Sequence, residues 1–540
     1  MNRLKQLKTT DSLGIIEWVI ILATPAIPLL FTFPYRINLF LAWEGAFRLS
    51  LGEVPYRDFG TPVGYVFWIL PAIFFKILGP SVITLLKVQA FINIISNYLF
   101  SRIFRQLKLE VGARVVALSI FVLSYSLFNF WPWYNHFVFV LEMASLLFAL
   151  KLLGENENKR IVLYCFLSAG FAALAFMTKQ DTGGFALLFS GAIILFDSIK
   201  RKKPVSVLTF IGAYLFWMIL LIAPFLMYDF TYWFNYGQTP HFSRLTFFDL
   251  LDEFLGASKW IKFYLVLIIV ILYYRLNNNW KTFFKTEIFV PFFIGLFILF
   301  QASVIQVTSY TPLDGNIYFH SFIFGVVLLQ FDSRIVFHKG WSFFIVICLV
   351  GLWWTNVFWV RNIRPKVKSY FQITEVDVVS KNTYVLDNDT SKMKRSNWVV
   401  PKFETFKGVK IPEETIEGIN KILEMPIVQR SKNDLQVLNM SELTQLAYEI
   451  PYDTEKGIDH PLWYHQGVAF FDREVQHFCS KVENKNYDLI LFQDIPDLNN
   501  FYSYEVRDCI LKNYELKFKF LAPRIPEESY IEVYTRRKTQ

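Results

Sequence analysis

Long apolar runs alternate with short polar segments through the first two thirds of the chain. The runs lie near 15–33, 83–104, 115–130, 137–152, 161–176, 185–196, 208–227, 263–274, 288–305, 318–329 and 341–360. Apolar runs of this kind are what helices need to cross a hydrocarbon core of ~30 Å. The pattern predicts a polytopic α-helical membrane protein with about 11 transmembrane helices.

Lys and Arg are concentrated in the polar segments that follow every second run. They include Arg102, Arg105, Lys159, Arg160, Lys200, Arg201, Lys202, Lys203, Arg275, Lys281 and Lys285. Because cytoplasmic loops carry an excess of basic residues, these segments are expected on the cytoplasmic side. The basic N-terminal residues indicate that the first run is a retained span that starts in the cytoplasm. With an odd number of crossings, the C-terminus is expected outside.

The composition changes at about residue 361 to a polar sequence of mixed charge. Helix-like segments at 414–423 and 468–481 are interspersed with strand-like segments at 435–438, 487–493 and 530–534. This alternation predicts an α/β domain that is large enough to bury a core of its own. The expected organisation is a multispanning transmembrane domain, 1–360, followed by an extracytoplasmic α/β domain, 361–540.

Composition and charge exclude several classes of protein. A chain that is 54% hydrophobic and 19% aromatic is too apolar for an ordinary soluble enzyme. The net charge of +9 comes from clusters between apolar runs and forms no continuous basic stripe, so no nucleic-acid partner is expected. Four cysteines exclude a disulfide scaffold and leave open one bridge, between Cys479 and Cys509. Motifs for nucleotide binding, zinc proteases and serine hydrolases do not occur.

The segment 35–62, YRINLFLAWEGAFRLSLGEVPYRDFGTP, places several charges between two apolar segments. Glu44 and Arg48 are four residues apart, so they share one face of a short helix and can pair. A glycine and a proline then break this helix and leave Arg57 and Asp58 in a turn. On spacing alone, a solvated surface loop with a weak ion pair is the simpler interpretation. The other interpretation is a catalytic loop.

The stretch 43–81 carries a resemblance to a known group of enzymes. It contains an acidic residue in the first outer loop, then LGEVPYRDF, a proline, an apolar helix and LGPS. This order resembles the multispanning GT-C glycosyltransferases that use lipid-linked sugars, a group with the protein O-mannosyltransferases and the aminoarabinose transferases of lipid A. Those families usually place Asp, often Asp-Glu, where this chain has Trp43-Glu44. Their helix that matches 63–78 lies along the outer membrane surface.

The resemblance implies a polyprenyl-phosphate sugar as the donor and puts Glu44 at the catalytic acidic position. Transfer of a sugar to a hydroxyl needs a base for the acceptor proton and positive charge for the departing phosphate. We expect Glu44 to be the base. Asp58 is the second candidate, as a base partner, an acceptor ligand or a metal ligand, and its alternative is a turn carboxylate paired with Arg57. A divalent metal cofactor is left open.

The predicted topology brings further ionisable residues to the outer membrane face from distant loops. Lys179, Arg57 and His320 are the candidates for binding the donor phosphate, and Asp181 is a further candidate for the site. Each has a simpler alternative. Lys179 could extend from a helix end to the membrane interface, Asp181 could cap the next helix, and His320 could pack in an interfacial belt of aromatic residues.

Together these features predict an inverting membrane glycosyltransferase, a hexosyl- or pentosyltransferase of cell-envelope glycans in the cell or inner membrane. The acceptor could be a glycan, a lipid or a protein. The alternative function is a lipid-linked glycan transporter or flippase, or a polymerase, and a receptor with an outer ligand-binding domain is a third. A transporter should carry ionisable residues near the middle of its spans, whereas these spans are expected to be apolar there.

Overall fold

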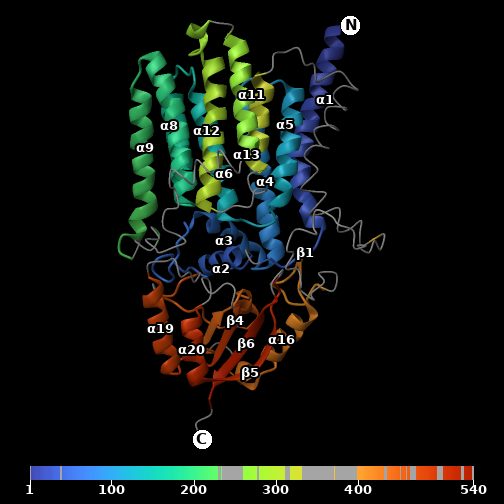
Figure 1. Cartoon of the computed structure of the whole chain (residues 1–540), viewed down its shortest axis with the longest axis vertical. Coiled ribbons are helices and arrows are strands. Elements are labelled where there is room, and N and C mark those ends of the chain that lie inside the picture. Colours follow the sequence, from blue (N-terminus) through green and yellow to red (C-terminus); the bar gives the residue numbers. More distant parts are fainter. Residues whose placement is uncertain are drawn as a thin grey trace.

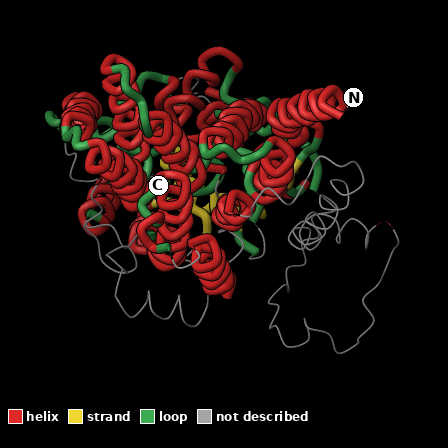
Figure 2. The backbone as a smooth tube through the Cα atoms, turned by 90° about the horizontal axis from the view of Figure 1, so that it is seen from above, coloured by secondary structure: helices red, strands yellow, loops and turns green. Residues whose placement is uncertain are grey.

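The computed structural model describes residues 2–36, 39–228, 233, 259–276, 279–309, 317–330, 370, 398–430, 434–450, 452–457, 459–462, 470–495, 503–524 and 528–537. These residues form a bundle of long helices, a thin middle layer and an α/β domain, stacked along the longest axis of the molecule (Figure 1). The bundle helices stand side by side when the molecule is viewed from above (Figure 2).

The bundle is built from the apolar runs, which become helices because backbone polar groups inside a bilayer must be paired within their own segment. Its helices are α1 (Asn2–Ala23), α4 (Val82–Gln106), α5 (Val111–Ser124), α6 (Tyr134–Leu152), α7 (Asn158–Phe176), α8 (Gln180–Arg201), α9 (Val205–Ile222), α11 (Lys259–Leu276), α12 (Thr286–Ser309) and α13 (Ile317–Gln330). Short 3₁₀ helices are η1 (Thr24–Leu30), η2 (Ser126–Phe128), η3 (Ala223–Phe225) and η6 (Trp280–Thr282).

Seven segments of the described residues are long and apolar enough to cross a membrane, and α5, α11 and α13 are shorter apolar helices. The predicted polytopic helical membrane fold is therefore confirmed. The first ten predicted spans coincide with bundle helices, and the eleventh, 341–360, lies outside the described residues. Helix α6 is enclosed by its neighbours, whereas α9 exposes Leu208, Leu215 and Ile219, as a helix in contact with lipid would.

Buried polar side chains join the bundle helices to one another. Arg114 of α5 pairs with Glu17 of α1 at 2.8 Å, and Gln301 of α12 donates a hydrogen bond to Glu142 of α6 at 2.8 Å. Glu142 is buried at the middle of its helix. The expectation that the spans are apolar in their middle was therefore wrong for α6. Glu142 is a single acidic residue among apolar ones, so the segment as a whole still reads as an apolar run.

The middle layer contains α2 (Leu39–Ser50) and α3 (Val66–Leu78), which lie between the bundle and the α/β domain (Figure 1). The two helices pack closely because Gly45 has no side chain: a Cβ there would lie 2.1 Å from the ring of Trp68. The buried indole of Trp68 donates to the carbonyl of Leu41 at 3.0 Å, and that of Trp43 donates to the carbonyl of Pro80 at 2.7 Å. These bonds join α3 to α2, and α2 to the segment that leads into α4.

The C-terminal part is an α/β domain around a four-stranded sheet of order β3-β4-β6-β5. Its strands are β3 (Val437–Met440), β4 (Leu489–Asp494), β5 (Tyr514–Leu521) and β6 (Tyr530–Arg536), and only the β3–β4 pair among them is parallel. The helices are α16 (Glu413–Leu423), α17 (Pro426–Arg430), α18 (Leu446–Glu449), α19 (Phe471–Glu483) and α20 (Tyr504–Asn513). Strand β4 is buried on both faces over its apolar first four residues, LILF, as this run indicates.

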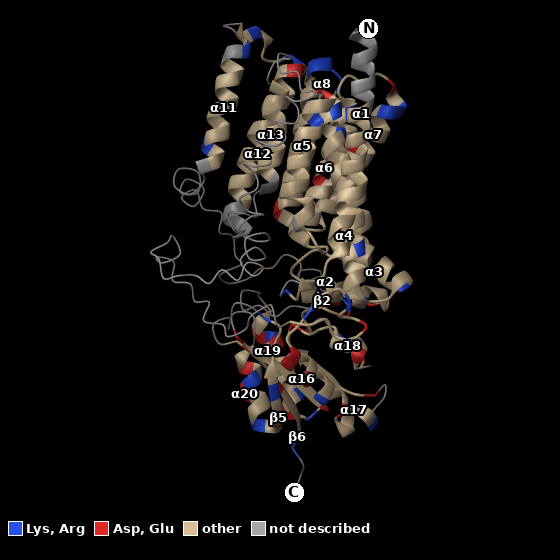
Figure 3. Ribbon diagram, turned by 90° about the vertical axis from the view of Figure 1, so that its right-hand side faces the viewer, with Lys and Arg blue, Asp and Glu red and all other residues tan. Residues whose placement is uncertain are grey.

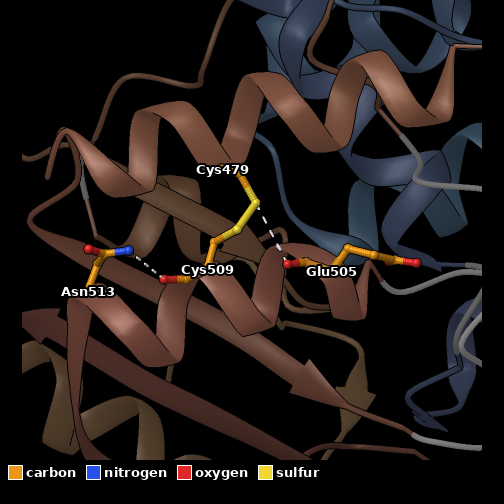
Figure 4. The surroundings of a disulfide bond; sticks show 4 residues. All are labelled: Cys479, Glu505, Cys509 and Asn513. Carbon is orange, nitrogen blue, oxygen red and sulfur yellow. Dashed lines mark hydrogen bonds between the residues drawn. A yellow bond between two sulfur atoms is a disulfide. The ribbon is translucent and has the colours of Figure 1, made fainter.

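A disulfide links two helices of this domain, and a short strand pairing joins the domain to the N-terminal part of the chain. Cys479 of α19 and Cys509 of α20 form a disulfide, with their Cα atoms 5.5 Å apart (Figure 4). The short strand β1 (Phe33–Pro34), which follows the first span, pairs in parallel with β2 (Val409–Lys410) ahead of α16. The predicted domain boundary at 361 lies outside the described residues, and this pairing ties the two parts together on either side of it.

Candidate functional site

The candidate site is built around an ion pair on helix α2. The Nε atom of Arg48 donates to Oε1 of Glu44 at 3.0 Å, at the four-residue spacing that the sequence predicts. The side chain of Arg48 is only 2% exposed and that of Glu44 14%. The pair is therefore buried between the bundle and the α/β domain, and it is not the solvated pair that spacing alone suggested. Loss of one partner from a buried pair costs about 3–5 kcal/mol.

Arg48 is shared among several acceptors. Its Nη1 atom donates to Oε2 of Glu53 at 2.9 Å and to the carbonyl of Glu455 at 2.9 Å, while Nη2 lies 3.0 Å from Nε2 of His460. Glu53 is buried as well and accepts a hydrogen bond from the hydroxyl of Thr454. Two carboxylates thus share one guanidinium. Thr454, Glu455 and His460 come from the α/β domain, and no pattern in the sequence indicates that they reach this pair.

The environment changes the proton affinity of the groups around Arg48. Burial raises the pKa of the Glu44 carboxyl above its ordinary value; Arg48 opposes this shift, and the charge of Glu53 adds to it. Burial holds the pKa of His460 well below its ordinary value, and the charge of Arg48 lowers it further. His460 is therefore neutral near pH 7, and its Nε2 atom can accept from Arg48.

Asp58 lies in the turn that follows α2. Its carboxylate accepts from Nη2 of Arg57 at 2.6 Å and from the backbone N–H of Val54 at 2.7 Å. Burial disfavours the ionised form, but these two donors outweigh burial and lower the pKa of Asp58. The turn also contains Tyr56 with φ of 65°, a conformation that few non-glycine residues adopt. In this state Asp58 is the turn carboxylate that pairs with Arg57, which leaves Glu44 as the more basic carboxylate of the two.

Lys179 and Asp181 lie at the start of α8. The Nζ atom of Lys179 is 3.0 Å from Oδ2 of Asp181, and Oδ1 of Asp181 accepts from the backbone N–H of Thr182 at 2.6 Å. A carboxylate in the first turn of a helix is favoured by the helix dipole. The N-cap position of α8 is Lys179 and it has no side-chain cap hydrogen bond, so Asp181 is not the cap that the simpler interpretation predicted. It lies in the first turn, where it holds the ammonium group of Lys179.

The turn that carries Lys179 packs directly against the loop that follows Asp58. The backbone N–H of Gly64 donates to the carbonyl of Thr178 at 3.3 Å, and a Cβ at Gly64 would lie 1.8 Å from the carbonyl oxygen of Met177. This approach brings segments that are more than a hundred residues apart in sequence into contact. The predicted convergence of the first outer loop and the Lys179 turn is therefore present in the structure.

The end of α9 and the following helix η3 lie beside the same loop. The rings of Tyr56 and Tyr65 lie 5.4 Å and 4.9 Å from the ring of Phe225, and the hydroxyl of Tyr65 donates to the carbonyl of Leu221 at 3.0 Å. The loop is thus fixed on two sides, by α9 and by the Lys179 turn. Arg57 remains half exposed beside it, next to Asp58.

His320 lies on α13 and packs against α11. Its ring centroid is 3.8 Å from that of Trp260 and 5.7 Å from that of Tyr264. This is the aromatic packing that the simpler interpretation predicted. The structure brings Glu44, Arg57, Asp58, Lys179 and Asp181 to the connected loops and helix ends between the bundle and the domain. The ring contacts that His320 makes with Trp260 and Tyr264 join it to α11.

Metal binding was left open by the sequence. Within the described ranges, no group of three or more His, Cys, Asp or Glu residues is placed to hold a metal ion. Both oxygens of Asp58, the candidate metal ligand, accept hydrogen bonds from Arg57.

Comparisons with known proteins found no matching family and no matching curated protein. Among solved structures, the chain is similar to ArnT from Cupriavidus metallidurans in the apo state, with 10% identity, a TM-score of 0.45, and coverage of 99% of this chain and 98% of that chain. The structure of the same ArnT bound to undecaprenyl phosphate gives 10% identity, a TM-score of 0.42 and 98% coverage of both chains.

Proposed function

We propose that this protein is a membrane glycosyltransferase that moves a sugar from a polyprenyl-phosphate donor to an acceptor hydroxyl at the outer membrane face. The observation that carries the proposal is the buried Glu44–Arg48 pair in the middle layer, beside the connected turns of Arg57 and Lys179. The motif resemblance over 43–81 supports the same reaction. One site thus combines a carboxylate of raised pKa with cations that can bind phosphate.

Glu44 accepts the proton of the acceptor hydroxyl in the proposed reaction. A carboxylate whose pKa lies above its ordinary value is a better general base near neutral pH, provided that it remains ionised. Arg48 keeps Glu44 ionised and fixes its orientation, but it is shared with Glu53 and does not neutralise Glu44 completely. A negative charge is therefore retained where the proton must be taken.

The acceptor oxygen attacks the anomeric carbon from the face opposite the phosphate, and the bond between that carbon and the phosphate oxygen breaks. The electron pair of this bond leaves with the phosphate, so the products are an inverted glycoside and a polyprenyl phosphate. Arg57 and Lys179 are the proposed partners of the departing phosphate, because positive charge aimed at developing negative charge lowers the barrier. The donor would carry a hexose or a pentose, and the acceptor would be a glycan, a lipid or a protein.

The charge distribution supports an extracytoplasmic site and α/β domain. Lys and Arg gather at the end of the bundle that lies farthest from this domain (Figure 3), and basic residues mark the cytoplasmic side. The disulfide between Cys479 and Cys509 supports the same orientation, because disulfides persist in oxidising compartments. We infer a membrane part, 1–360, and an extracytoplasmic domain, 361–540, with the site between them.

Turnover of a defined donor tests the proposal. The purified full chain in liposomes is supplied with undecaprenyl-phosphate-linked hexoses or pentoses and with a membrane extract as the source of acceptor, and free undecaprenyl phosphate is measured by mass spectrometry. Glycosyl transfer predicts acceptor-dependent release of undecaprenyl phosphate from at least one donor. Donors that all remain intact with well-folded protein would contradict the proposal.

Glu142 gives the transporter alternative its one specific support. A buried carboxyl in the middle of a span is expensive, and in transporters such groups often mark a pathway. Its hydrogen bond from Gln301 also explains it as a link between α6 and α12. A fluorescent lipid-linked sugar distinguishes the two functions, since a transporter would move it between leaflets with the sugar still attached.

A further inference from the structure

A segment of the α/β domain, residues 452–457 and 459–462, contacts the candidate site. The backbone N–H of Gly60 donates to the carbonyl of His460 at 2.9 Å, and the N–H of Leu462 donates to the carbonyl of Gly60 at 2.9 Å. The N–H of Gly457 donates to the carbonyl of Asp58 at 2.8 Å. These three bonds attach the segment to the loop that carries Arg57 and Asp58, although the two are about four hundred residues apart in sequence.

The same segment also contacts the guanidinium of Arg48, at the Nη1 and Nη2 atoms. Arg48 donates through Nη1 to the carbonyl of Glu455, and its Nη2 atom lies 3.0 Å from Nε2 of His460. The contact to His460 requires a lone pair on Nε2, because arginine has donors only. The His460 proton is therefore on Nδ1, which has no hydrogen-bond partner among the described residues.

We propose that residues 452–457 and 459–462 complete the site around Glu44, and that His460 is a positioning residue that acts on Glu44 through Arg48. The guanidinium is a rigid planar fork, so the acceptors of Nη1 and Nη2 determine where Nε points. His460 and the carbonyl of Glu455 hold one side of the fork, and Glu44 receives a single hydrogen bond from the other. This assignment rests on the proposed function, in which Glu44 is the base.

The consequence of losing His460 follows from the donors of Arg48. Without an acceptor at this position, the guanidinium can move as a whole so that Nη2 gives Glu44 a second bond beside that of Nε, and such bidentate pairs are stronger than single ones. A more tightly paired carboxylate binds a proton less readily and is a weaker base. Other titratable groups near Arg48 and His460 also influence the proton affinity of Glu44, and a substitution of His460 changes none of them. They are Glu53, Lys456, Tyr452, Glu455, His477 and Lys481.

Three variants of the full chain test the proposal in the liposome assay with the undecaprenyl-phosphate sugar that the wild type turns over. His460→Ala should lower kcat about tenfold or more, as expected for a lost hydrogen bond to a charged group, and should move the acidic limb of the pH–rate profile to lower pH. His460→Gln provides an amide oxygen that can accept from Arg48, so it should restore much of the rate and the limb. Lys517→Ala on the edge strand β5, whose ion pair is with Glu515, removes a charge away from this site and should behave as wild type.

The outcomes distinguish a positioning role of His460 from a purely structural one, and they distinguish failure of this proposal from failure of the proposed function. Unchanged kcat and pH profile in His460→Ala overturn the positioning role while transfer by the wild type stands. Equal losses in His460→Ala and His460→Gln, with an unshifted acidic limb and a lower melting temperature, also overturn it, because packing alone would then explain the loss. A wild-type protein that transfers no sugar from any donor removes both proposals.

Discussion

Replacement of Gly64 by alanine tests whether the first outer loop and the Lys179 turn act as one unit. The Cβ of Gly64→Ala would lie 1.8 Å from the carbonyl oxygen of Met177 and 2.9 Å from the Cα atom of Thr178. Both neighbours are backbone atoms, so no side chain can rotate away. The loop and the turn must separate by about 1.2 Å to reach 3.0 Å, below which real Cβ contacts essentially never fall.

This displacement gives the magnitude of the expected effect. A misplacement of about 1 Å between catalytic and binding groups can cost about 10²-fold in rate, and overpacking costs about 1–3 kcal/mol of stability. We therefore expect Gly64→Ala to insert into the membrane, to melt at a lower temperature and to lose about 10²-fold in kcat/KM. The substituted residue itself contacts no group that we assign to the chemistry, so the loss would come from geometry.

Gly184→Ala is the matched control. Gly184 lies in α8, a few residues after Lys179, and a Cβ there meets nothing within 4 Å. Alanine is the better helix former, so this variant should be as stable as the wild type or more so, with unchanged activity. Both variants are assayed for donor turnover and thermal melting in the same liposomes. A Gly64→Ala protein with wild-type kcat/KM would refute the view that the contact between loop and turn sets the geometry of the site.

Three further predictions follow from the site and the topology. Lys179→Ala should raise the KM for the donor about tenfold or more, as expected for loss of a charge-assisted contact to phosphate. Lys203→Ala, beyond the other end of α8, should leave this KM unchanged. If the two variants have the same KM for the donor, Lys179 is an interfacial residue and does not bind the phosphate. Cys479 and Cys509 should react with a thiol reagent only after reduction, and the double serine variant should lose about 2–4 kcal/mol of the free energy of unfolding of its domain; labelling of Cys479 or Cys509 in the untreated protein would count against an oxidising compartment. A tag after Lys203 should be cytoplasmic and one at Gln540 accessible from outside intact cells, and a cytoplasmic tag at Gln540 would contradict the proposed topology.

Periodicity and spacing predicted the parts of the molecule that depend on local sequence. The apolar runs matched the bundle helices because a bilayer leaves a long apolar segment few structures other than a helix. The spacing of Glu44 and Arg48 predicted their pairing because both lie on one short helix. The α/β domain was predicted from the alternation of its segments, although α20 and β5 were not. Strand β5 is an exposed edge strand with alternating lysines and is less apolar than β4.

Long-range contacts could not be predicted from the sequence. Nothing near His460 or Glu455 indicates that they reach Arg48 across about four hundred residues, because a backbone carbonyl and a single histidine have no recognisable pattern. The burial of Arg48 was equally hidden, since burial depends on how the domain docks on the middle layer. Glu142 could have been noticed as an acidic residue within an apolar run, which is a signal for a buried polar contact.

The most direct measurement of the central claim is the pH dependence of sugar transfer by the wild type and by Glu44→Gln. Glutamine can still accept from Arg48, so insertion and folding should persist, while loss of the base should lower kcat by about 10²- to 10⁴-fold. The pKa of Glu44 is raised, and the ionised form is active, so the wild-type rate should rise with pH through that pKa and fall below it. The residual activity of Glu44→Gln should lack this acidic limb, and Asp58→Asn should retain it. Transfer by Glu44→Gln at the wild-type rate and with the wild-type pH profile would contradict the account.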